Sequence, residues 1–328
     1  MASLLVTGPT GSGKSTTLYA ALSQLAEKKI NCVTVEDPVE KLINGVTQVQ
    51  VNAKAGLTFA TALRSILRQD PDVIMVGEIR DEETADIGVR AAVTGHLVLS
   101  TLHTNDCVSA VYRLQNMGIP FYMIAAATTG VVAQRLVKVL CPHCRRKIKA
   151  GQQTKRLLYE VSGKEAEEVW EAVGCEECLN TGYSHRRAIY EMFELNETTK
   201  NMIRDGETAE KIRRYQRERG FLSLQEQAAQ MVMNGEMDME EAEKVIYSAD
   251  SKFQENVKIQ GRQCMKNRKW KEKKRIYLSG TDLRDRDHGH FNGCGSTFLQ
   301  LYPGEICQTG SYFQCKSQLY AGKSAAGN

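Results

Sequence analysis

A glycine-rich stretch at residues 8–16, GPTGSGKST, has the residue types and spacing of a phosphate-binding loop. An apolar run at residues 4–6 precedes it, and a sequence typical of a helix follows it. In this order of strand, loop and helix, the glycines allow consecutive backbone N–H groups to turn toward one anion at the helix N-terminus. We therefore expect Lys14 to contact the β- and γ-phosphates of a nucleoside triphosphate, and the Ser15 hydroxyl to bind Mg²⁺.

The same stretch has a plainer interpretation, an ordinary Gly/Ser turn between a strand and a helix. Several positions of the motif are specified together, which makes a chance match rare, so we prefer the nucleotide interpretation. The expected nucleotide-binding residues are Gly8, Thr10, Gly11, Ser12, Gly13, Lys14, Ser15 and Thr16.

Three other apolar runs end in polar residues that suit phosphate chemistry. These residues are Glu36, Glu78 and His103. Because the carboxyl ends of parallel strands meet at one edge of a sheet, we expect all three beside the glycine-rich loop. Glu78 is the expected catalytic carboxylate, Glu36 is a second candidate for orienting water or holding Mg²⁺, and His103 is a candidate donor to the γ-phosphate. A lone glutamate after a strand is usually a solvated turn residue, so their shared position carries the hypothesis.

Two Cys-x₂-Cys pairs, separated by 30 residues, have the spacing of metal ligands. The expected ligands are Cys141, Cys144, Cys175 and Cys178. Four thiolates make a closed tetrahedral Zn²⁺ site with no open position for catalysis, so we expect a structural zinc ion. A redox-active Cys-x-x-Cys is the rival interpretation, but two such pairs favour a metal. His143 is a less favoured ligand, and residues 166–172 between the pairs resemble a helix.

Composition limits the class of protein. The chain has 328 residues, of which 42% are hydrophobic and 25% charged, and no apolar run approaches the ~20 residues of a membrane span. The sequence enters its first strand directly, without a signal peptide, so we expect a soluble, cytoplasmic protein. Residues 1–252 hold 30 Lys/Arg and 33 Asp/Glu, so the net charge of +4 comes from the remaining residues. A nucleic-acid partner cannot be argued from the whole-chain charge.

The coarse pattern predicts an α/β domain with a largely parallel sheet, followed by smaller parts. Thr58, Asp81 and Thr208 are expected to cap helices. A charged run at residues 266–275 lies in a basic tail that is either an appended arm or an artefact of the gene model. The expected divisions are 1–137 for the nucleotide-binding core, 138–190 for the tetracysteine segment, 191–250 for a helical subdomain and 251–328 for the tail.

Four motifs together resemble one family, the ATPases that power type II secretion and type IV pilus assembly. The resemblance covers residues 3 to about 250 and is carried by the following stretches: GPTGSGKST at 8–16, VTVEDPVE at 33–40, LRQDPDVIMVGEIRD at 67–81 and TGHLVLSTLHTND at 94–106. It implies a RecA-like P-loop NTPase core, a tetracysteine zinc segment and a C-terminal helical subdomain. It also implies a hexameric motor that uses ATP, Mg²⁺ and Zn²⁺.

By position in these motifs, the resemblance implies that Lys14 and Ser15 hold phosphate and Mg²⁺. It further implies that Glu78 is the catalytic carboxylate, that Glu36 is its partner from the acidic box (residues 33–40), and that His103 is the γ-phosphate contact. Arg80 and Arg90 are possible charge-stabilising or intersubunit residues. The implied partners are platform proteins of the inner membrane, at whose cytoplasmic face the motor is peripheral, and no nucleic acid is expected.

The sequence differs from the family pattern in one respect that bears on activity. Members of the family carry an N-terminal region with a domain that closes over the nucleotide and supplies arginines, and this sequence does not include it, so weak hydrolysis is expected. The tetracysteine segment resembles that of secretion and assembly motors, whereas retraction motors lack it, which favours export or extension. The alternatives are a nucleotide-binding scaffold of low activity and a zinc-ribbon nucleic-acid-binding protein with a basic tail.

Overall fold

The structure is a computed structural model that describes residues 3–249. The predictions for residues 251–328, including the charged run, lie outside the described residues. The strands are β1 (Ser3–Thr7), β2 (Cys32–Glu36), β3 (Val46–Gln50), β4 (Val73–Val76), β5 (Leu97–Leu102), β6 (Thr128–Leu140), β7 (Arg146–Lys149), β8 (Glu168–Glu171) and β9 (Tyr183–Glu194). The α-helices are α1 (Lys14–Ala26), α2 (Phe59–Ile66), α3 (Glu82–Val93), α4 (Cys107–Asn116), α5 (Phe121–Ala127), α6 (Gln152–Ser162), α7 (Glu197–Arg204), α8 (Ala209–Glu218), α9 (Leu224–Met233) and α10 (Met239–Ala249).

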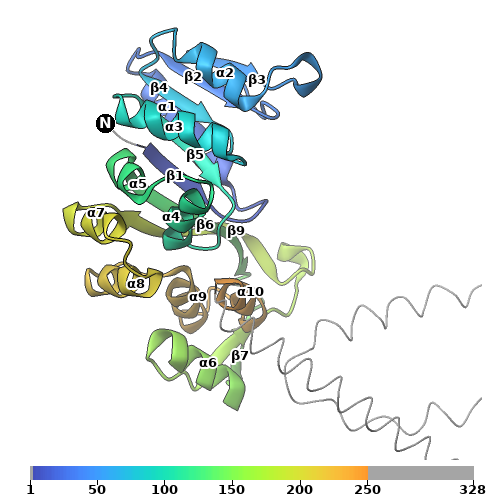
Figure 1. Ribbon diagram of the computed structural model, residues 1–328. Helices are drawn as coiled ribbons and strands as arrows, with labels where there is room; N and C mark the ends of the chain where they lie inside the picture. Colours follow the sequence, from blue (N-terminus) through green and yellow to red (C-terminus); the bar gives the residue numbers. More distant parts are fainter. Residues whose placement is uncertain (1–2, 250–328) are drawn as a thin grey trace, which may run out of the picture. The chain divides into compact units, whose positions relative to one another are not determined.

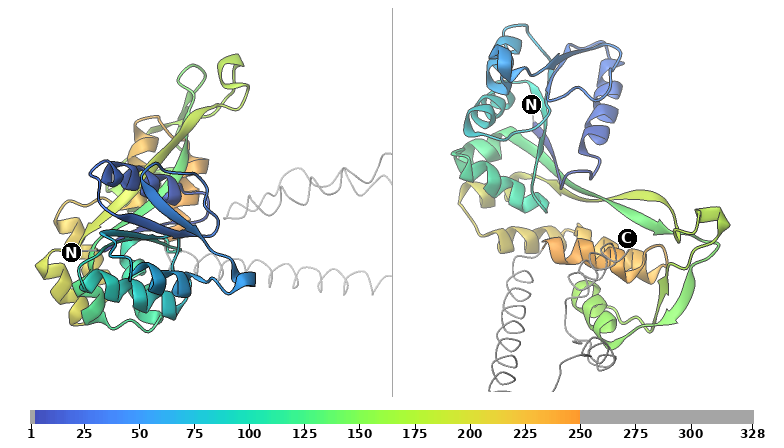
Figure 2. Two further views of the ribbon diagram at one scale, coloured as in Figure 1. Left: turned by 90° about the horizontal axis from the view of Figure 1, so that it is seen from above. Right: turned by 90° about the vertical axis from the view of Figure 1, so that its right-hand side faces the viewer.

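A seven-stranded sheet in the order β3-β2-β4-β5-β1-β6-β9 forms the centre of the fold. Every neighbouring pair is parallel except β6 and β9, which are antiparallel. Helix α1 covers one face and helices α2 to α5 cover the other (Figures 1 and 2). Strands covered on both faces are mostly apolar, and all four residues of β4 are. The predicted α/β domain with a largely parallel sheet is confirmed.

The core beneath α1 joins the helix after the glycine-rich loop to the middle of the sheet. Leu18, Tyr19 and Leu22 of α1 pack with Val6 of β1 and Leu99 of β5. Leu22 and Val6 are fully buried. Burying one such side chain stabilises the fold by about 1.5–3 kcal/mol, so this packing fixes the direction in which α1 leaves the loop.

Side-chain caps begin the helices at the expected residues. Thr58 accepts a hydrogen bond from the Thr61 N–H at 3.2 Å, and Asp81 accepts one from the Thr84 N–H at 2.8 Å. Thr208 caps α8 in the same way. Each cap satisfies an N–H group that the first helical turn leaves without a partner. These three predictions are confirmed.

The expected helix at residues 166–172 is wrong. Residues 168–171 form strand β8, which pairs with β7 in a separate two-stranded sheet, and the helix of this segment is α6. Within β8, Val169 is buried, Glu168 is exposed, and the last two residues are half-buried. Pairing with β7 overrides the weak helical preference of the flanking residues, and that partner is distant in sequence.

Strands β6 and β9 are much longer than the other strands and run on as a two-stranded ribbon (Figure 2). The divisions expected at residues 137 and 190 fall inside these two strands. Beyond the ribbon lie β7, α6 and β8, and helices α7 to α10 follow β9 in the chain. No helix in the described part of the chain is long and apolar enough to span a membrane.

Candidate nucleotide site and metal centre

The glycine-rich loop and the three predicted polar residues lie at the same edge of the sheet. Strands β1, β2, β4 and β5 are parallel and in register, so their carboxyl ends meet at one edge. Glu36 ends β2, Glu78 follows β4 by two residues, and His103 directly follows β5. The expectation that these elements converge agrees with the topology.

The backbone of the loop requires glycine at specific positions. Gly13 has φ of 87° and is the N-cap of α1, where no side chain caps the first helical turn. Gly8 has φ of 149°, and a Cβ there would lie 2.3 Å from the carbonyl oxygen of Gln134. The uncapped N–H groups leave the positive end of α1 facing the loop, which fits an anionic phosphate group.

Lys14 lies within the curve of the loop. Its Nζ donates to the carbonyl oxygens of Gly8 at 2.9 Å and Pro9 at 3.0 Å. Burial lowers the pKa of Lys14, and the nearby negative charge of Glu78 opposes that shift. A desolvated ammonium group with only carbonyl partners can exchange them for phosphate oxygens, with which its interaction is stronger.

Two serine hydroxyl groups, those of Ser12 and Ser15, lie close to Lys14 in the sequence. Ser15 Oγ donates to Glu40 Oε1 at 3.3 Å. Ser12 is 3% exposed, and its Oγ has no hydrogen-bond partner among the described residues. A serine beside a carboxylate is an oxygen donor set that suits Mg²⁺.

The side chain of Gln134, on β6, forms hydrogen bonds with the glycine-rich loop and with α1. Its Nε2 donates to the Ser12 carbonyl oxygen at 2.9 Å, and its Oε1 accepts from Thr17 Oγ1 at 2.7 Å. The side chain therefore joins the loop to the first turn of α1. Sequence reasoning missed this role, because Gln134 is one of several polar residues in β6 and the local pattern does not distinguish it from the others.

Glu78 lies between two other charged or titratable side chains of the candidate site, Arg80 and His103. Its side chain is 16% exposed, it forms an ion pair with Arg80, and its Oε2 lies 3.4 Å from His103 Nε2. Arg80 also lies 3.9 Å from an oxygen of Asp37. Glu78 and His103 are thus brought together, with a 60%-exposed arginine over the carboxylate. Arg90, by contrast, pairs with Asp86 on its own helix.

Glu36 is placed differently from the other two. It is 4% exposed, and its carboxylate accepts hydrogen bonds from Tyr19, from Thr34 at 2.5 Å and from Gln48 at 3.0 Å. Burial and the hydrogen bond to Glu36 raise the pKa of Tyr19 to about 12. Three side chains thus engage the oxygens of Glu36, and Glu40 is the carboxylate of residues 33–40 that contacts Ser15.

The four predicted cysteines form one cluster. Their sulfur atoms all lie within 4.8 Å of one another, with Cys141–Cys175 at 3.9 Å and Cys144–Cys178 at 3.8 Å. A tetrahedral site with Zn–S bonds near 2.3 Å has sulfur atoms about 3.8 Å apart, so the cluster fits Zn²⁺.

Backbone N–H groups donate to two sulfur atoms of this cluster. The N–H of Gly174 donates to Cys144 Sγ at 3.3 Å and the N–H of Gly182 to Cys178 Sγ at 3.2 Å. Burial opposes ionisation of Cys178, but the N–H groups of Cys175 and Gly182, with the thiols of Cys175 and Cys144, outweigh it and lower the pKa of Cys178 to about 6. The Cys178 N–H lowers the pKa of Cys175, but burial and hydrogen bonds to the other three thiols outweigh it and raise that pKa to about 11, so without a metal the cluster favours a thiolate at Cys178 beside a protonated Cys175. A thiolate is the form that binds zinc.

A half-buried carboxyl, Glu191 of β9, lies near the N-terminus of α4 and gives a pH-dependent prediction. Burial and the charge of Asp106 raise the pKa of Glu191 to about 6, from an ordinary value of 4.5. Between pH 4.5 and about 6, the Glu191 carboxyl is therefore protonated in the folded chain and ionised in the unfolded chain. The free energy of unfolding decreases as the pH rises through this range, and the loss is complete above about pH 6. Glu191→Gln should stabilise the chain at pH 8 by about 1–2 kcal/mol and have little effect at pH 5.

Thermal unfolding at the two pH values tests this expectation. Glu191→Gln should raise Tm at pH 8 by about 2–8 °C relative to the unmodified chain. The exposed Glu165→Gln serves as a control and should leave Tm unchanged at both pH values. An equal change at pH 5 and pH 8 would contradict the raised pKa.

Comparisons with known proteins assign the family. Residues 1–244 match the family described as "Type II/IV secretion system protein". The chain is 48% identical over 246 residues to the type II secretion system protein HxcR of Pseudomonas aeruginosa, covering 75% of this chain and 49% of HxcR. It is 46% identical over 241 residues to the type IV pilus assembly ATPase PilB of Thermus thermophilus, covering 72% of this chain and 27% of PilB.

Solved structures agree with this assignment. The pilus retraction motor PilT with bound ADP aligns with a TM-score of 0.57 and 29% identity, over 77% of this chain and 62% of PilT. The Legionella pneumophila ATPase DotB shares the fold, with a TM-score of 0.53 at 22% identity, over 75% of this chain and 60% of DotB. The chain spans about half the length of HxcR. From the matched residues and the shared fold, we conclude that the chain belongs to the type II/IV secretion system protein family.

Proposed function

We propose that this chain binds and hydrolyses ATP as part of a motor that powers type II secretion or type IV pilus assembly. The observation that carries the proposal is the convergence of the Lys14 loop, Glu78 and His103 at one sheet edge. Membership in a family whose relatives are named secretion and pilus-assembly proteins adds to it.

Binding would depend mainly on the glycine-rich loop. Its N–H groups and the Lys14 ammonium would replace water around the phosphates, as the uncapped N-terminus of α1 favours. Ser15, with Glu40 beside it, would hold Mg²⁺, which neutralises phosphate charge when bound. The hydrogen bond from Gln134 to the Ser12 carbonyl oxygen would keep the loop in its curved conformation.

Hydrolysis would depend on Glu78. In the reaction of ATP with water to give ADP and phosphate, its carboxylate would accept a hydrogen bond from the attacking water and orient it. Arg80 covers this carboxylate and must move aside, which its 60% exposure allows. His103, 3.4 Å from Glu78, would donate to the γ-phosphate. Glu36 would act indirectly: Tyr19, which donates to it, accepts the Glu40 N–H at 3.1 Å.

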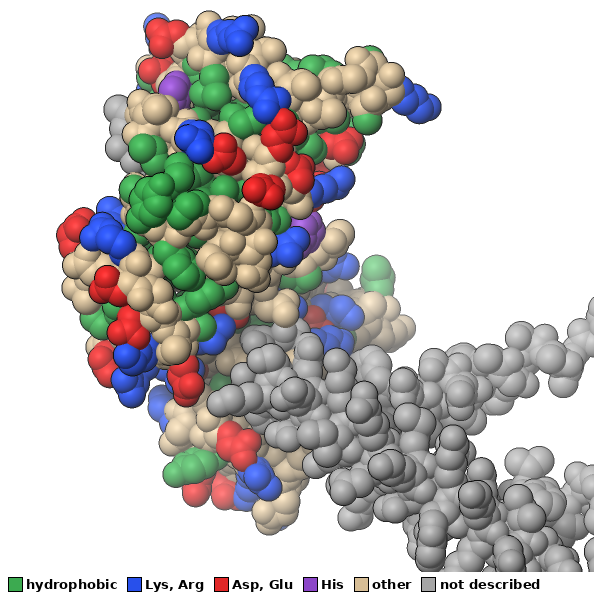
Figure 3. All heavy atoms as spheres, viewed as in Figure 1, with side chains coloured by type: hydrophobic (Ala, Val, Ile, Leu, Met, Phe, Trp, Pro, Cys, Tyr) green, Lys and Arg blue, Asp and Glu red, His purple; other side chains and the backbone are tan. Residues whose placement is uncertain are grey.

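The remaining assignments concern assembly. We propose that Cys141, Cys144, Cys175 and Cys178 hold a structural Zn²⁺ that stabilises the end of the β6–β9 ribbon. We also propose a hexamer that works with platform proteins at the cytoplasmic face of the inner membrane. Direct nucleic-acid binding is not part of the proposal: on the face in Figure 3, basic and acidic side chains are interspersed rather than gathered into a basic stripe.

Phosphate release, measured over a range of protein concentrations together with oligomeric state by light scattering, tests this function. We expect Mg²⁺-dependent ATP hydrolysis that increases per chain as oligomers form, and none with Lys14→Ala. A wild-type rate no faster than that of Lys14→Ala at every concentration would contradict the hydrolytic function. Retained nucleotide binding with that result would favour the scaffold alternative.

A further inference from the structure

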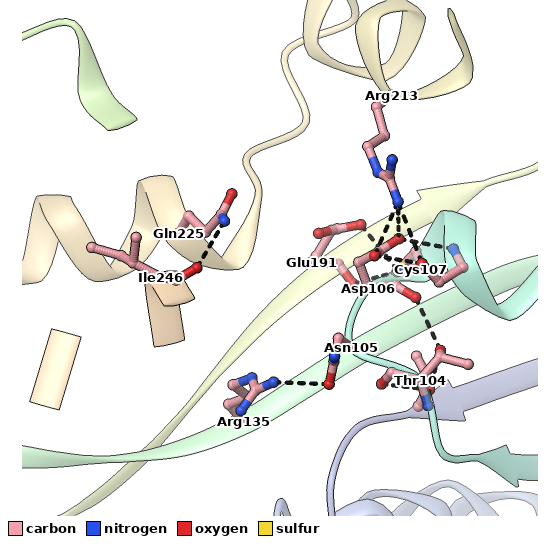
Figure 4. A network of polar contacts seen from close by, with 11 residues as sticks. Thr104, Asn105, Asp106, Cys107, Arg135, Glu191, Arg213, Gln225 and Ile246 are labelled. Atoms are coloured by element: carbon pink, nitrogen blue, oxygen red, sulfur yellow. Dashed lines mark hydrogen bonds and ion pairs between the residues drawn. The ribbon is translucent and has the colours of Figure 1, made fainter. Parts of the chain in front are cut away.

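One guanidinium ties helix α8 to the loop that carries His103. Arg213 Nη2 lies 3.2 Å from Oδ1 and 3.1 Å from Oδ2 of Asp106, and the Asp106 side chain is 10% exposed. Figure 4 shows Arg213 reaching from its helix to the loop in front of α4. The two residues lie 107 positions apart in the sequence, so only the tertiary fold brings them together.

Asp106 is the point at which this loop becomes a helix. Its Oδ1 accepts from the Ser109 N–H at 2.8 Å and its Oδ2 from the Ser109 hydroxyl at 2.6 Å, which makes it the N-cap of α4. Arg213 donates to the same two oxygens and also to Ser109 Oγ at 3.3 Å. Donors on both sides hold the carboxylate, and with it the end of the loop, in one orientation.

The contacts continue from Asp106 to the start of the glycine-rich loop. Thr104 Oγ1 donates to the Asp106 carbonyl oxygen at 3.1 Å. The same hydroxyl lies 2.6 Å from Thr7 Oγ1, which also accepts the Thr104 N–H at 2.9 Å. Thr7 directly precedes Gly8, and Thr104 directly follows His103. Residues 103–106 are therefore held at one end by β1 and at the other by α8.

We propose that Arg213 is a positioning residue of the nucleotide site. Through Asp106 and Thr104 it fixes residues 103–106, and so His103, against the end of β1. The inference rests on the proposed function, because the position of His103 matters when a phosphate occupies the loop. Placing a donor within a fraction of an ångström is what makes it effective toward a bound phosphate.

A plain stabilising ion pair is the competing interpretation. Arg213 is 39% exposed and Asp106 10% exposed, so the pair can contribute to stability as well. Asp106 is also hydrogen-bonded through Thr104 to Thr7, which directly precedes the glycine-rich loop. Because the hydrogen bonds connect Arg213 to this loop as well as to α4, we favour a role in the nucleotide site.

Amide hydrogen exchange on the full chain, with and without Mg-ATP, tests the proposal. The variants are Arg213→Gln, Arg213→Lys, which keeps a cation for Asp106, and Arg214→Gln, which changes the exposed neighbour on the same helix. We expect ATP to slow exchange at residues 8–16 in all four chains. We expect it to slow exchange at residues 103–106 about fivefold or more in wild type, Arg213→Lys and Arg214→Gln, and not in Arg213→Gln.

The outcomes separate the inference from the function. Equal protection of residues 103–106 in all four chains would overturn the role of Arg213 and leave the proposed function standing. No protection of residues 8–16 in wild type would contradict the function and the inference with it. If Arg213→Gln does not fold, Asp106→Asn replaces it, since it keeps a cap oxygen and weakens the pair. This variant should show the same loss, and unchanged protection would overturn the proposal.

Discussion

Replacing Glu78 with glutamine is expected to slow ATP hydrolysis by about a hundredfold or more while ATP binding is retained. An amide has nearly the shape of the carboxylate but cannot accept the proton of an attacking water, and positioned bases of this kind contribute about 10²–10⁴-fold to rate. The ion pair between Glu78 and Arg80 and the 3.4 Å contact with His103 are also lost or weakened. Single-turnover phosphate release, with binding measured separately, gives the two quantities.

A matched control separates the catalytic effect from a general one. Glu27→Gln changes an exposed glutamate at the end of α1 by the same chemistry and should leave the rate unchanged. If Glu78→Gln hydrolyses ATP as fast as wild type, Glu78 does not orient the water. The acidic-box residue Glu40 would then be the next candidate, because it contacts Ser15.

Removing the metal from the four-cysteine cluster is the second large change. Cys141→Ser should reduce the zinc content from about one ion per chain to near zero and unfold the part that contains β7, α6 and β8. Structural zinc contributes about 10–16 kcal/mol of apparent binding free energy in zinc-finger peptides, far more than a small two-stranded sheet supplies by itself. Elemental analysis measures the metal, and hydrogen exchange over residues 141–182 measures the local unfolding.

The chain offers a suitable control for this experiment. Cys32 is a buried cysteine in β2, outside the cluster, so Cys32→Ala should lower stability without changing the zinc content. We expect ATP affinity to be unchanged in Cys141→Ser, because the nucleotide loop contacts β6 near Gln134 rather than the cluster. A zinc content of about one per chain in Cys141→Ser would contradict the assigned ligand set.

Features that depend on neighbouring residues could be predicted from the sequence. The helix caps at Thr58, Asp81 and Thr208 depend on one side chain and the next turn of backbone. The shared edge of Glu78 and His103 follows from parallel strands, because each strand ends where its polar residue begins. The cysteine cluster follows from two short spacings.

Features that depend on distant partners were missed or misplaced. Strand β8 requires β7, the orientation of Glu36 requires Tyr19, and the roles of Gln134 and Arg213 require loops more than a hundred residues away. None of these partners is visible in a local pattern. The hydrogen-bond donors around a buried carboxylate decide which way its side chain points. The position of Glu36 at the end of a strand therefore did not reveal which groups it contacts.

Calorimetric titration of Mg-ATP into the wild-type chain and Lys14→Ala tests the central claim, that residues 8–16 bind the phosphates of a nucleotide. The account predicts one site per wild-type chain and an affinity at least about a hundredfold weaker in Lys14→Ala, because the buried phosphate charge loses its cation. Lys28→Ala, an exposed lysine after α1, should bind as wild type does. Equal affinities for wild type and Lys14→Ala would contradict the claim.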